Sequence, residues 1–159
     1  MKLPLRLSLM ALLCLLIISS CKKETPVPEK DIFTVNIDGN LENFTYNFVV
    51  NSNFMTSSSG KMMRIVGDGP VSMINININD YNGVGEYFLS DNRRQVVGAY
   101  GKKALGSQKE ENYVLIDGSV KILSVTEDRI KGTFYFIATD YGGAIKKTID
   151  GIFYLRLTK

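Results

Sequence analysis

The sequence contains no histidine and no tryptophan, and only two of its 159 residues are cysteine. Without histidine, neither a Ser-His-Asp nor a Cys-His catalytic arrangement can form, and the usual imidazole ligands of zinc and copper are missing. Cys14 and Cys21 both lie in or directly after an N-terminal apolar segment. The rest of the chain therefore has no thiol for catalysis, for a disulfide or for a metal. We expect a protein that is not an enzyme and holds no metal or other cofactor.

The chain also lacks an apolar run long enough to span a bilayer. Leu7 to Ile18 is its N-terminal apolar segment, whereas a transmembrane helix needs about 20 apolar residues. Lys2 and Arg6 precede this segment, and the small residues Ser19 and Ser20 follow it. A basic start, a short apolar core and a small-residue exit are typical of an export signal.

The export signal ends in a motif that suggests lipid attachment. Residues 18–21 are ISSC, which resembles the lipobox of a bacterial lipoprotein, with Ser20 at the small position before cleavage. The resemblance implies that residues 1–20 are removed, that the Cys21 sulfur carries a diacylglyceryl group and that the new N-terminus is acylated, for example with palmitate. Two or more acyl chains anchor a protein stably in a membrane. An ordinary secretory signal with an incidental cysteine is the alternative.

Residues 21–30 have the composition of a tether. They contain Pro26 and Pro28 and no apolar periodicity, so an extended segment could span roughly 30 Å at about 3.1 Å per residue. Lys22 follows the cysteine where an aspartate would resemble an inner-membrane retention signal, which favours the outer membrane. We therefore expect a lipid-anchored protein of the cell envelope, held at the outer membrane.

The net charge gives no reason to expect a nucleic-acid partner. Residues 1–20 carry two basic residues and no acidic one, so their removal lowers the formal net charge from +3 to +1. A nucleic-acid-binding domain would instead show a clear basic patch. The acyl chains make the membrane the one partner that the sequence specifies.

The chain from residue 31 to residue 159 shows the alternation of β-strands. Ile74, Ile76 and Ile78 alternate with asparagines, which a strand would separate onto opposite faces. Asp38-Gly39 is a two-residue hairpin signal, and Gly151 interrupts the last strand pattern, where a bulge is expected. No window of ten or more residues has helical spacing. These patterns predict one all-β domain, an antiparallel sandwich or flattened barrel of about eight to ten strands.

Five glycine-flanked strand signatures follow one another along this domain: FTVNIDG (Phe33–Gly39), GEYFL (Gly85–Leu89), GSVKI (Gly118–Ile122), IKGTFYFIA (Ile130–Ala138) and IDGIF (Ile149–Phe153). Their order resembles that in small all-β lipoproteins of Bacteroidota, a domain family of unknown function. The resemblance implies an all-β fold, a cell-envelope location and no known catalytic residue. Members often carry an aromatic residue after the first Asp-Gly, where this chain has Asn40 and Leu41.

The most suggestive polar feature is the row formed by Asn75, Asn77 and Asn79, which Tyr81 extends. Three amides on a barrel interior or an open sheet could hydrogen-bond a glycan or a peptide. Tyr81, together with Tyr87 and Tyr100, could add aromatic surface for a sugar. A solvated outer sheet face is the alternative interpretation.

Three functions follow from these observations. The first is a non-catalytic binding module for an unknown protein or glycan, and the second is a calycin-like barrel that carries a small apolar ligand. The third is a hydrolase with a carboxylate pair, drawn from five acidic residues: Glu86, Asp117, Asp128, Asp140 and Asp150. Several of these flank glycines, where aspartate favours turns. We therefore expect the binding module.

Overall fold

The computed structural model describes residues 30–158, with gaps at residues 43, 45, 53–60, 91–92 and 107–108. The expected signal (1–20), Cys21 and all of the tether except Lys30 lie outside the described residues. Within the described part, no helix is both long and apolar enough to cross a membrane. The chain divides at Lys30, and residues 31–159 form a compact unit of their own.

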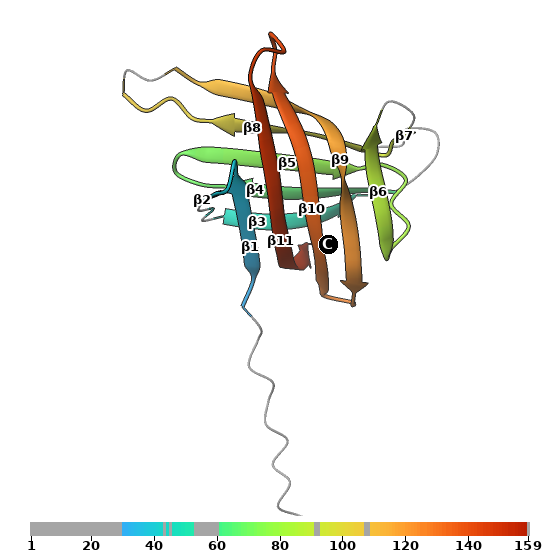
Figure 1. The fold of residues 1–159 in the computed structure, drawn as a ribbon. Coiled ribbons are helices and arrows are strands. Elements are labelled where there is room, and N and C mark those ends of the chain that lie inside the picture. Colours follow the sequence, from blue (N-terminus) through green and yellow to red (C-terminus); the bar gives the residue numbers. More distant parts are fainter. Residues whose placement is uncertain are drawn as a thin grey trace, which may run out of the picture. The chain divides into compact units, whose positions relative to one another are not determined.

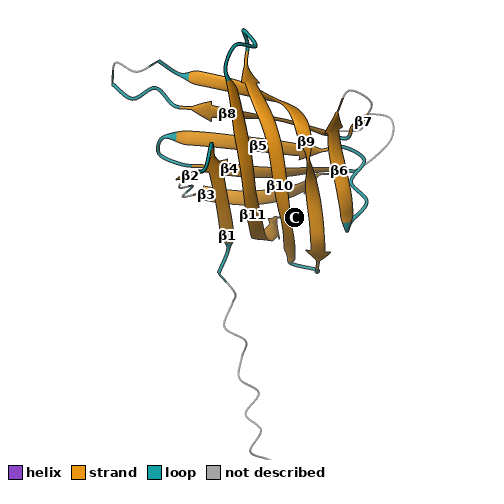
Figure 2. Ribbon diagram, viewed as in Figure 1, coloured by secondary structure: helices purple, strands orange, loops and turns teal. Residues whose placement is uncertain are grey.

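The described part of this unit contains eleven strands, which confirms the expected all-β class (Figure 2). Two of them are very short, and the remaining nine agree with the expected number. The strands are β1 (Ile32–Ile37), β2 (Asn40–Glu42), β3 (Tyr46–Ser52), β4 (Met62–Asp68), β5 (Ser72–Ile78), β6 (Gly85–Ser90), β7 (Arg93–Arg94), β8 (Val96–Lys102), β9 (Glu111–Val125), β10 (Arg129–Asp140) and β11 (Lys146–Thr158).

The strands lie in two layers that cross each other (Figure 1). One layer contains β1, β11, β10 and β6, and the other contains β3, β4, β5 and β8. The long strand β9 belongs to both layers, because Tyr113 pairs with Tyr100 of β8 whereas Val120 pairs with Tyr87 of β6. The architecture is a sheet folded over on itself, in agreement with the expected sandwich or flattened barrel.

Two irregularities let β9 turn from one layer into the other. Its register with β10 shifts between Ile137 and Ala138 and again between Lys131 and Gly132. At these points Ile116 and Leu123 of β9 have no counterpart on β10. Bulges of this kind bend a strand and increase its twist, which is why one continuous strand can serve both layers.

The opposite seam is closed by β11 and β3. Leu157 and Thr158 pair in parallel with Val49 and Val50, whereas every other pairing among the described strands is antiparallel. This short contact completes a ring of β11, β3, β4, β5, β8, β9 and β10. The flattened barrel is therefore held at one corner by a shared strand and at the other by a short parallel pair.

The structure confirms one glycine prediction and corrects another. Asp38 and Gly39 both have positive φ, 51° and 80°, as the predicted two-residue hairpin between β1 and β2 requires. The bulge expected at Gly151 is wrong, because Gly151 pairs in unbroken register with Val35 and Phe134. A Cβ at Gly151 would collide with the Phe134 ring. Glycine is needed there for close packing, not for a change of register.

The interior of the folded sheet is filled by apolar side chains. Ile74, Ile76 and Ile78 are fully buried, as their alternation predicted. Phe134 stacks on Phe136 and Phe153, with ring centroids 6.0 and 6.4 Å apart. Burial of one such side chain contributes about 1.5–3 kcal/mol. The core is therefore well packed with aliphatic and aromatic groups.

Candidate functional site

The structure separates the predicted asparagine row into two parts. Asn75 and Asn77 lie on the outer face of β5, opposite its isoleucines, and the Asn77 Oδ1 accepts a hydrogen bond of 2.7 Å from Arg64 Nε. The Asn75 Oδ1 is buried and has no hydrogen-bond partner among the described residues. Asn79 lies in the turn after β5, where its backbone N–H donates to the Gln95 carbonyl. Two amides, not three, share the sheet face.

The tyrosines do not extend this face, and that expectation is wrong. Tyr81, Tyr87 and Tyr100 are all part of the buried core. The loop after β5 returns Tyr81 to the inner side, where its ring lies 5.8 Å from that of Tyr87. Burial raises the pKa of Tyr81 to about 12. These three tyrosines therefore form no aromatic platform for a sugar beside the asparagines.

The five acidic residues considered for a carboxylate pair have local hydrogen bonds instead. Asp117 and Asp140 accept backbone N–H groups one and five residues further along the chain, and Asp128 accepts a threonine hydroxyl two residues before it. Glu86 and Asp150 accept side-chain donors from Ser119 and Asn36 on neighbouring strands. Among the described residues, no group of three or more acidic, cysteine or histidine side chains could hold a metal ion.

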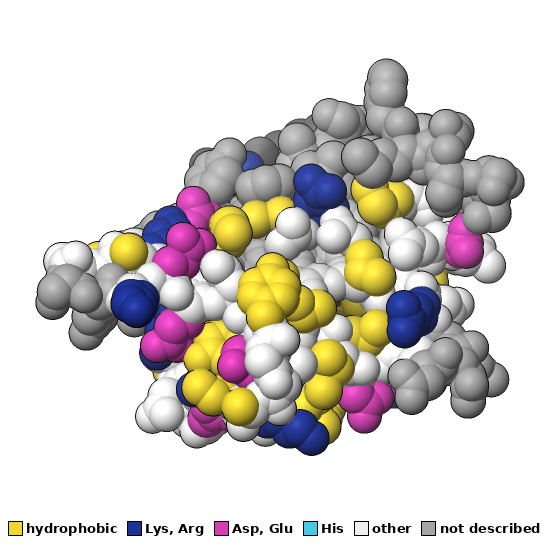
Figure 3. Space-filling view, turned by 90° about the horizontal axis from the view of Figure 1, so that it is seen from above, with side chains coloured by type: hydrophobic (Ala, Val, Ile, Leu, Met, Phe, Trp, Pro, Cys, Tyr) yellow, Lys and Arg dark blue, Asp and Glu magenta, His cyan; other side chains and the backbone are white. Residues whose placement is uncertain are grey.

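A hollow of about 450 Å³ opens at the barrel end beside the β8–β9 loop. Acidic and basic side chains gather at that end, on the left in Figure 3. We call this hollow the mouth. It is lined by Glu42, Val71, Lys102, Lys103, Leu105, Lys109 and Glu111.

The mouth is built by polar residues that occupy inward positions at strand ends. Ser72, Lys102 and Glu111 are cross-strand neighbours on β5, β8 and β9. Lys102 lies two residues after Tyr100 and Glu111 two residues before Tyr113, and both tyrosines are buried. Because side chains alternate with a period of two, the polar row lies directly above the apolar core.

Hydroxyl groups from the core fix the two carboxylates of the mouth. Tyr100 Oη and Ser72 Oγ donate to the two oxygens of Glu42, at 3.3 and 3.1 Å. Tyr113 Oη donates to Glu111 Oε2 at 2.8 Å, and its ring stacks on that of Tyr100 with centroids 5.9 Å apart. The carboxylates are therefore held in defined places by rigid neighbours.

Both tyrosines remain protonated donors at neutral pH. Burial, and then the negative charge of Glu42, raise the pKa of Tyr100. Burial, and then the hydrogen bond to Glu111, raise the pKa of Tyr113 to about 12. Neither hydroxyl is prepared to act as a base or a nucleophile, so the geometry suits binding.

The three lysines of the mouth differ in their partners. Lys103 Nζ is engaged by Asp68 Oδ1 at 2.6 Å and by the Gly69 carbonyl at 2.8 Å. The side-chain ammonium groups of Lys102 and Lys109 form no hydrogen bond or close ion pair with any other described residue. Two ammonium groups at the mouth are therefore free to meet an anion.

Sequence patterns alone do not single out Glu42, Glu111, Lys102 or Lys109 as site residues. The alternation of the strands contains a partial signal. Lys102 and Glu111 each lie two residues from a buried tyrosine, so they occupy inward-facing positions at the ends of β8 and β9. Glu42 could not be found in this way, since it comes from β2 and meets the others only through the folded sheet.

A second hollow, of about 350 Å³, lies at the corner where β8 and β9 separate. Val97, Val114 and Ile116 are exposed there, and Arg94 is on the rim. The lining is mainly aliphatic and offers fewer directional groups than the mouth. We therefore regard the mouth as the candidate site.

No family model, curated protein or solved structure matches this chain.

Proposed function

We propose that this chain is a non-catalytic, lipid-anchored protein of the cell envelope whose β domain binds a ligand at the mouth. The observation that carries the binding proposal is the combination of two fixed carboxylates, Glu42 and Glu111, with two free ammonium groups around one hollow. A concave site with a few convergent polar groups is the usual form of a small-ligand site.

The anchor is supported by the sequence at residues 18–21 and by the resemblance to small lipoproteins of Bacteroidota. We propose that Cys21 carries the lipid and that the outer membrane is its location, since Lys22 replaces the aspartate of an inner-membrane retention signal. The ten residues 21–30 then serve as a spacer between the lipid and the domain.

A calycin-like carrier is not favoured. Such a carrier needs an internal cavity for its apolar ligand, whereas the interior here holds a cluster of buried side chains that includes Tyr100, Phe134, Phe136 and Phe153. The ligand site that we propose is polar and lies at the barrel end.

The anchor is tested by labelling cells with a palmitate analogue. The wild-type protein should take up the label and sediment with membranes. A Cys21→Ala variant should do neither, and a Cys14→Ala variant should behave as the wild type. Labelling of the Cys21→Ala protein would refute the anchor.

The binding proposal is tested with residues 31–159, which form a compact unit with their own core. This fragment should retain a ligand from a glycan array or an envelope extract. Replacing both Lys102 and Lys109 by Gln should weaken retention, whereas Lys131→Gln, an exposed lysine on β10 outside the mouth, should not. Failure to retain any ligand in either assay would count against a binding module.

A further inference from the structure

We infer that the mouth recognises a sugar that carries an anionic group, either a carboxylate or a phosphate. This inference rests on the proposed function and names its ligand class. The lining offers ammonium groups for the anionic group of such a molecule and carboxylates for its hydroxyl groups.

The anionic group of the ligand would meet Lys102 and Lys109. Both ammonium groups line the hollow, and neither forms a close ion pair with a described carboxylate, although the charge of Lys102 acts at longer range on Asp38. Lys103 lies beside them but is already engaged by Asp68 and Gly69. Asp68 therefore neutralises only Lys103, and the ammonium groups of Lys102 and Lys109 remain available to a ligand.

The hydroxyl groups of the ligand would donate to Glu42 and Glu111. A carboxylate offers about four acceptor positions. Protein donors use two of them on Glu42, from Tyr100 and Ser72, and one on Glu111, from Tyr113. Hydrogen bonds to an ionised acceptor are stronger than neutral ones, so the remaining positions favour a molecule rich in hydroxyl groups.

The strand that carries Lys102 offers no added-strand site to an acidic peptide. Peptides are commonly bound as an added strand on a free sheet edge or as a helix in an apolar groove. Lys102 of β8 is paired with Ser72 on one side and with Glu111 on the other, so β8 presents no free edge at the mouth. Val71 and Leu105 provide only two apolar contacts, which suit the C–H groups of a sugar ring better than a helix.

The test compares ligands that differ in one group. The purified chain would be titrated calorimetrically with oligogalacturonate, with the uncharged oligogalactose of equal length, and with glucose 6-phosphate and glucose. A glutamate-rich peptide of equal charge serves as the non-sugar anion. Each titration would be repeated at low and high salt, because exposed charge pairs are screened by ions.

At least one anionic sugar should bind about tenfold or more tightly than its neutral counterpart, with affinity falling at high salt. Each of Lys102→Gln and Lys109→Gln should weaken that binding about 2- to 5-fold, as expected for loss of one exposed charge pair. The Lys131→Gln protein should bind as the wild type, and comparison of the two sugar pairs identifies the carboxylate or the phosphate as the preferred group.

The inference fails if the neutral sugar binds equally well, if the peptide binds as tightly as the anionic sugars, or if the two lysine variants bind normally. Retention of some other ligand by the fragment would then leave the binding module intact. Absence of any ligand in both sets of experiments would overturn the inference and the module together.

Discussion

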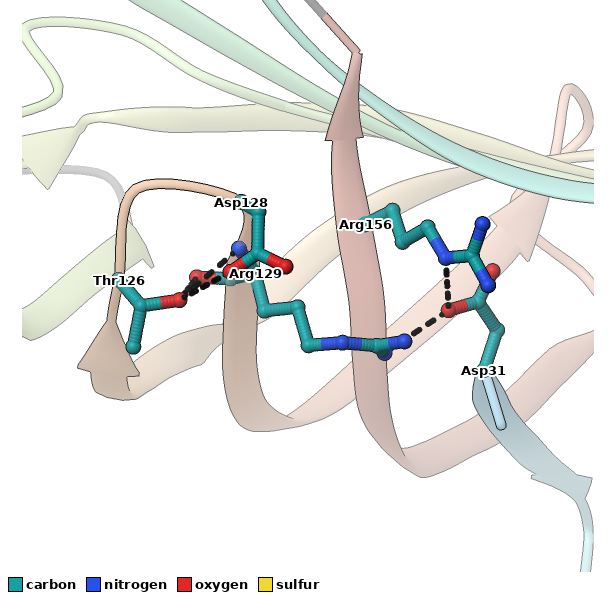
Figure 4. Close-up of polar contacts among 5 residues, drawn as sticks. All are labelled: Asp31, Thr126, Asp128, Arg129 and Arg156. Atoms are coloured by element: carbon teal, nitrogen blue, oxygen red, sulfur yellow. Dashed lines mark hydrogen bonds and ion pairs between the residues drawn. The ribbon is translucent and has the colours of Figure 1, made fainter. Parts of the chain in front are cut away.

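Arg129 and Asp31 form an ion pair across 98 positions of sequence, with 3.0 Å between Nη1 and Oδ1 (Figure 4). Arg156 Nε approaches the same carboxylate oxygen at 3.8 Å. The Arg129 side chain is buried and lies 4.7 Å from the centre of the Tyr154 ring, whereas the Arg156 side chain is exposed. The first residue of the domain is therefore fixed to β10 and β11 mainly through Arg129.

Replacement of Arg129 by Met should lower the free energy of unfolding by about 1–3 kcal/mol, because it removes a charged hydrogen bond and the contact with Tyr154. Arg156→Met is the matched control and should cost less than about 1 kcal/mol, as exposed ion pairs do. Urea unfolding measures both values. Equal losses would show that burial does not distinguish the two arginines.

Gly118→Ala should lower the free energy of unfolding by more than the cost of a positive φ alone. That conformational cost is about 1–2 kcal/mol. Gly118 has φ of 127°, and a Cβ there would collide with the Tyr135 carbonyl oxygen next to the bend in β9. Gly83 has φ of 97° and open space around it, so Gly83→Ala should show the conformational cost alone. Thermal unfolding of both variants separates the two effects, and equal melting temperatures would contradict the collision.

Tyr81→Phe should leave stability unchanged or raise it by up to about 1 kcal/mol. The Tyr81 hydroxyl is buried and has no partner among the described residues, so its removal relieves an unfavourable burial. Tyr87→Phe should instead cost about 1–3 kcal/mol, since its hydroxyl accepts from the Asn82 N–H and donates to the Gly83 carbonyl, both at 2.9 Å. Denaturant unfolding of the pair provides the comparison. A similar loss for both would show that the Tyr81 hydroxyl is satisfied.

Asp38→Asn should reduce stability at neutral pH and have little effect in acid. The Thr148 N–H at 2.8 Å, followed by Lys147 at 3.0 Å, lowers the pKa of Asp38 below its ordinary value of about 3.9. A lowered pKa contributes stability that is present above the ordinary value and is lost as pH falls through the folded one. Asparagine tolerates the left-handed φ of 51° at this position.

The measurement for Asp38 is the difference in unfolding free energy between variant and wild type from neutral pH to about pH 2. The difference should shrink as the wild-type carboxylate is protonated. A difference that stays constant over this range would mean that the loss arises from the turn and not from the charge.

Local features of the fold could be predicted from the sequence because they depend on neighbouring residues. The isoleucines of β5 are buried because alternation places them on one face, and Asp38-Gly39 makes the hairpin because both residues accept positive φ. The interruption at Gly151 suggests a bulge from sequence alone, but its real role depends on Phe134, which reaches it only after β10 pairs with β11.

The mouth could not be predicted for the same reason. It requires β5 to pair with β8, which places Ser72 beside Lys102, and it requires β2 to bring Glu42 to the same end. Neither relation is encoded by spacing along the chain. Polar residues in the inward phase of a strand end are a local signal, but only the strand order shows that several of them meet.

The central place of β11 also determines when the domain can assemble. It pairs with β1, β10 and, through the parallel seam, β3, and the bond between Asn36 and Asp150 joins positions 114 residues apart. During synthesis the first strands emerge long before this partner and keep unpaired edges meanwhile. Closure of long loops must precede such pairings, so folding should be slow and the early strands should be prone to aggregate until β11 is available.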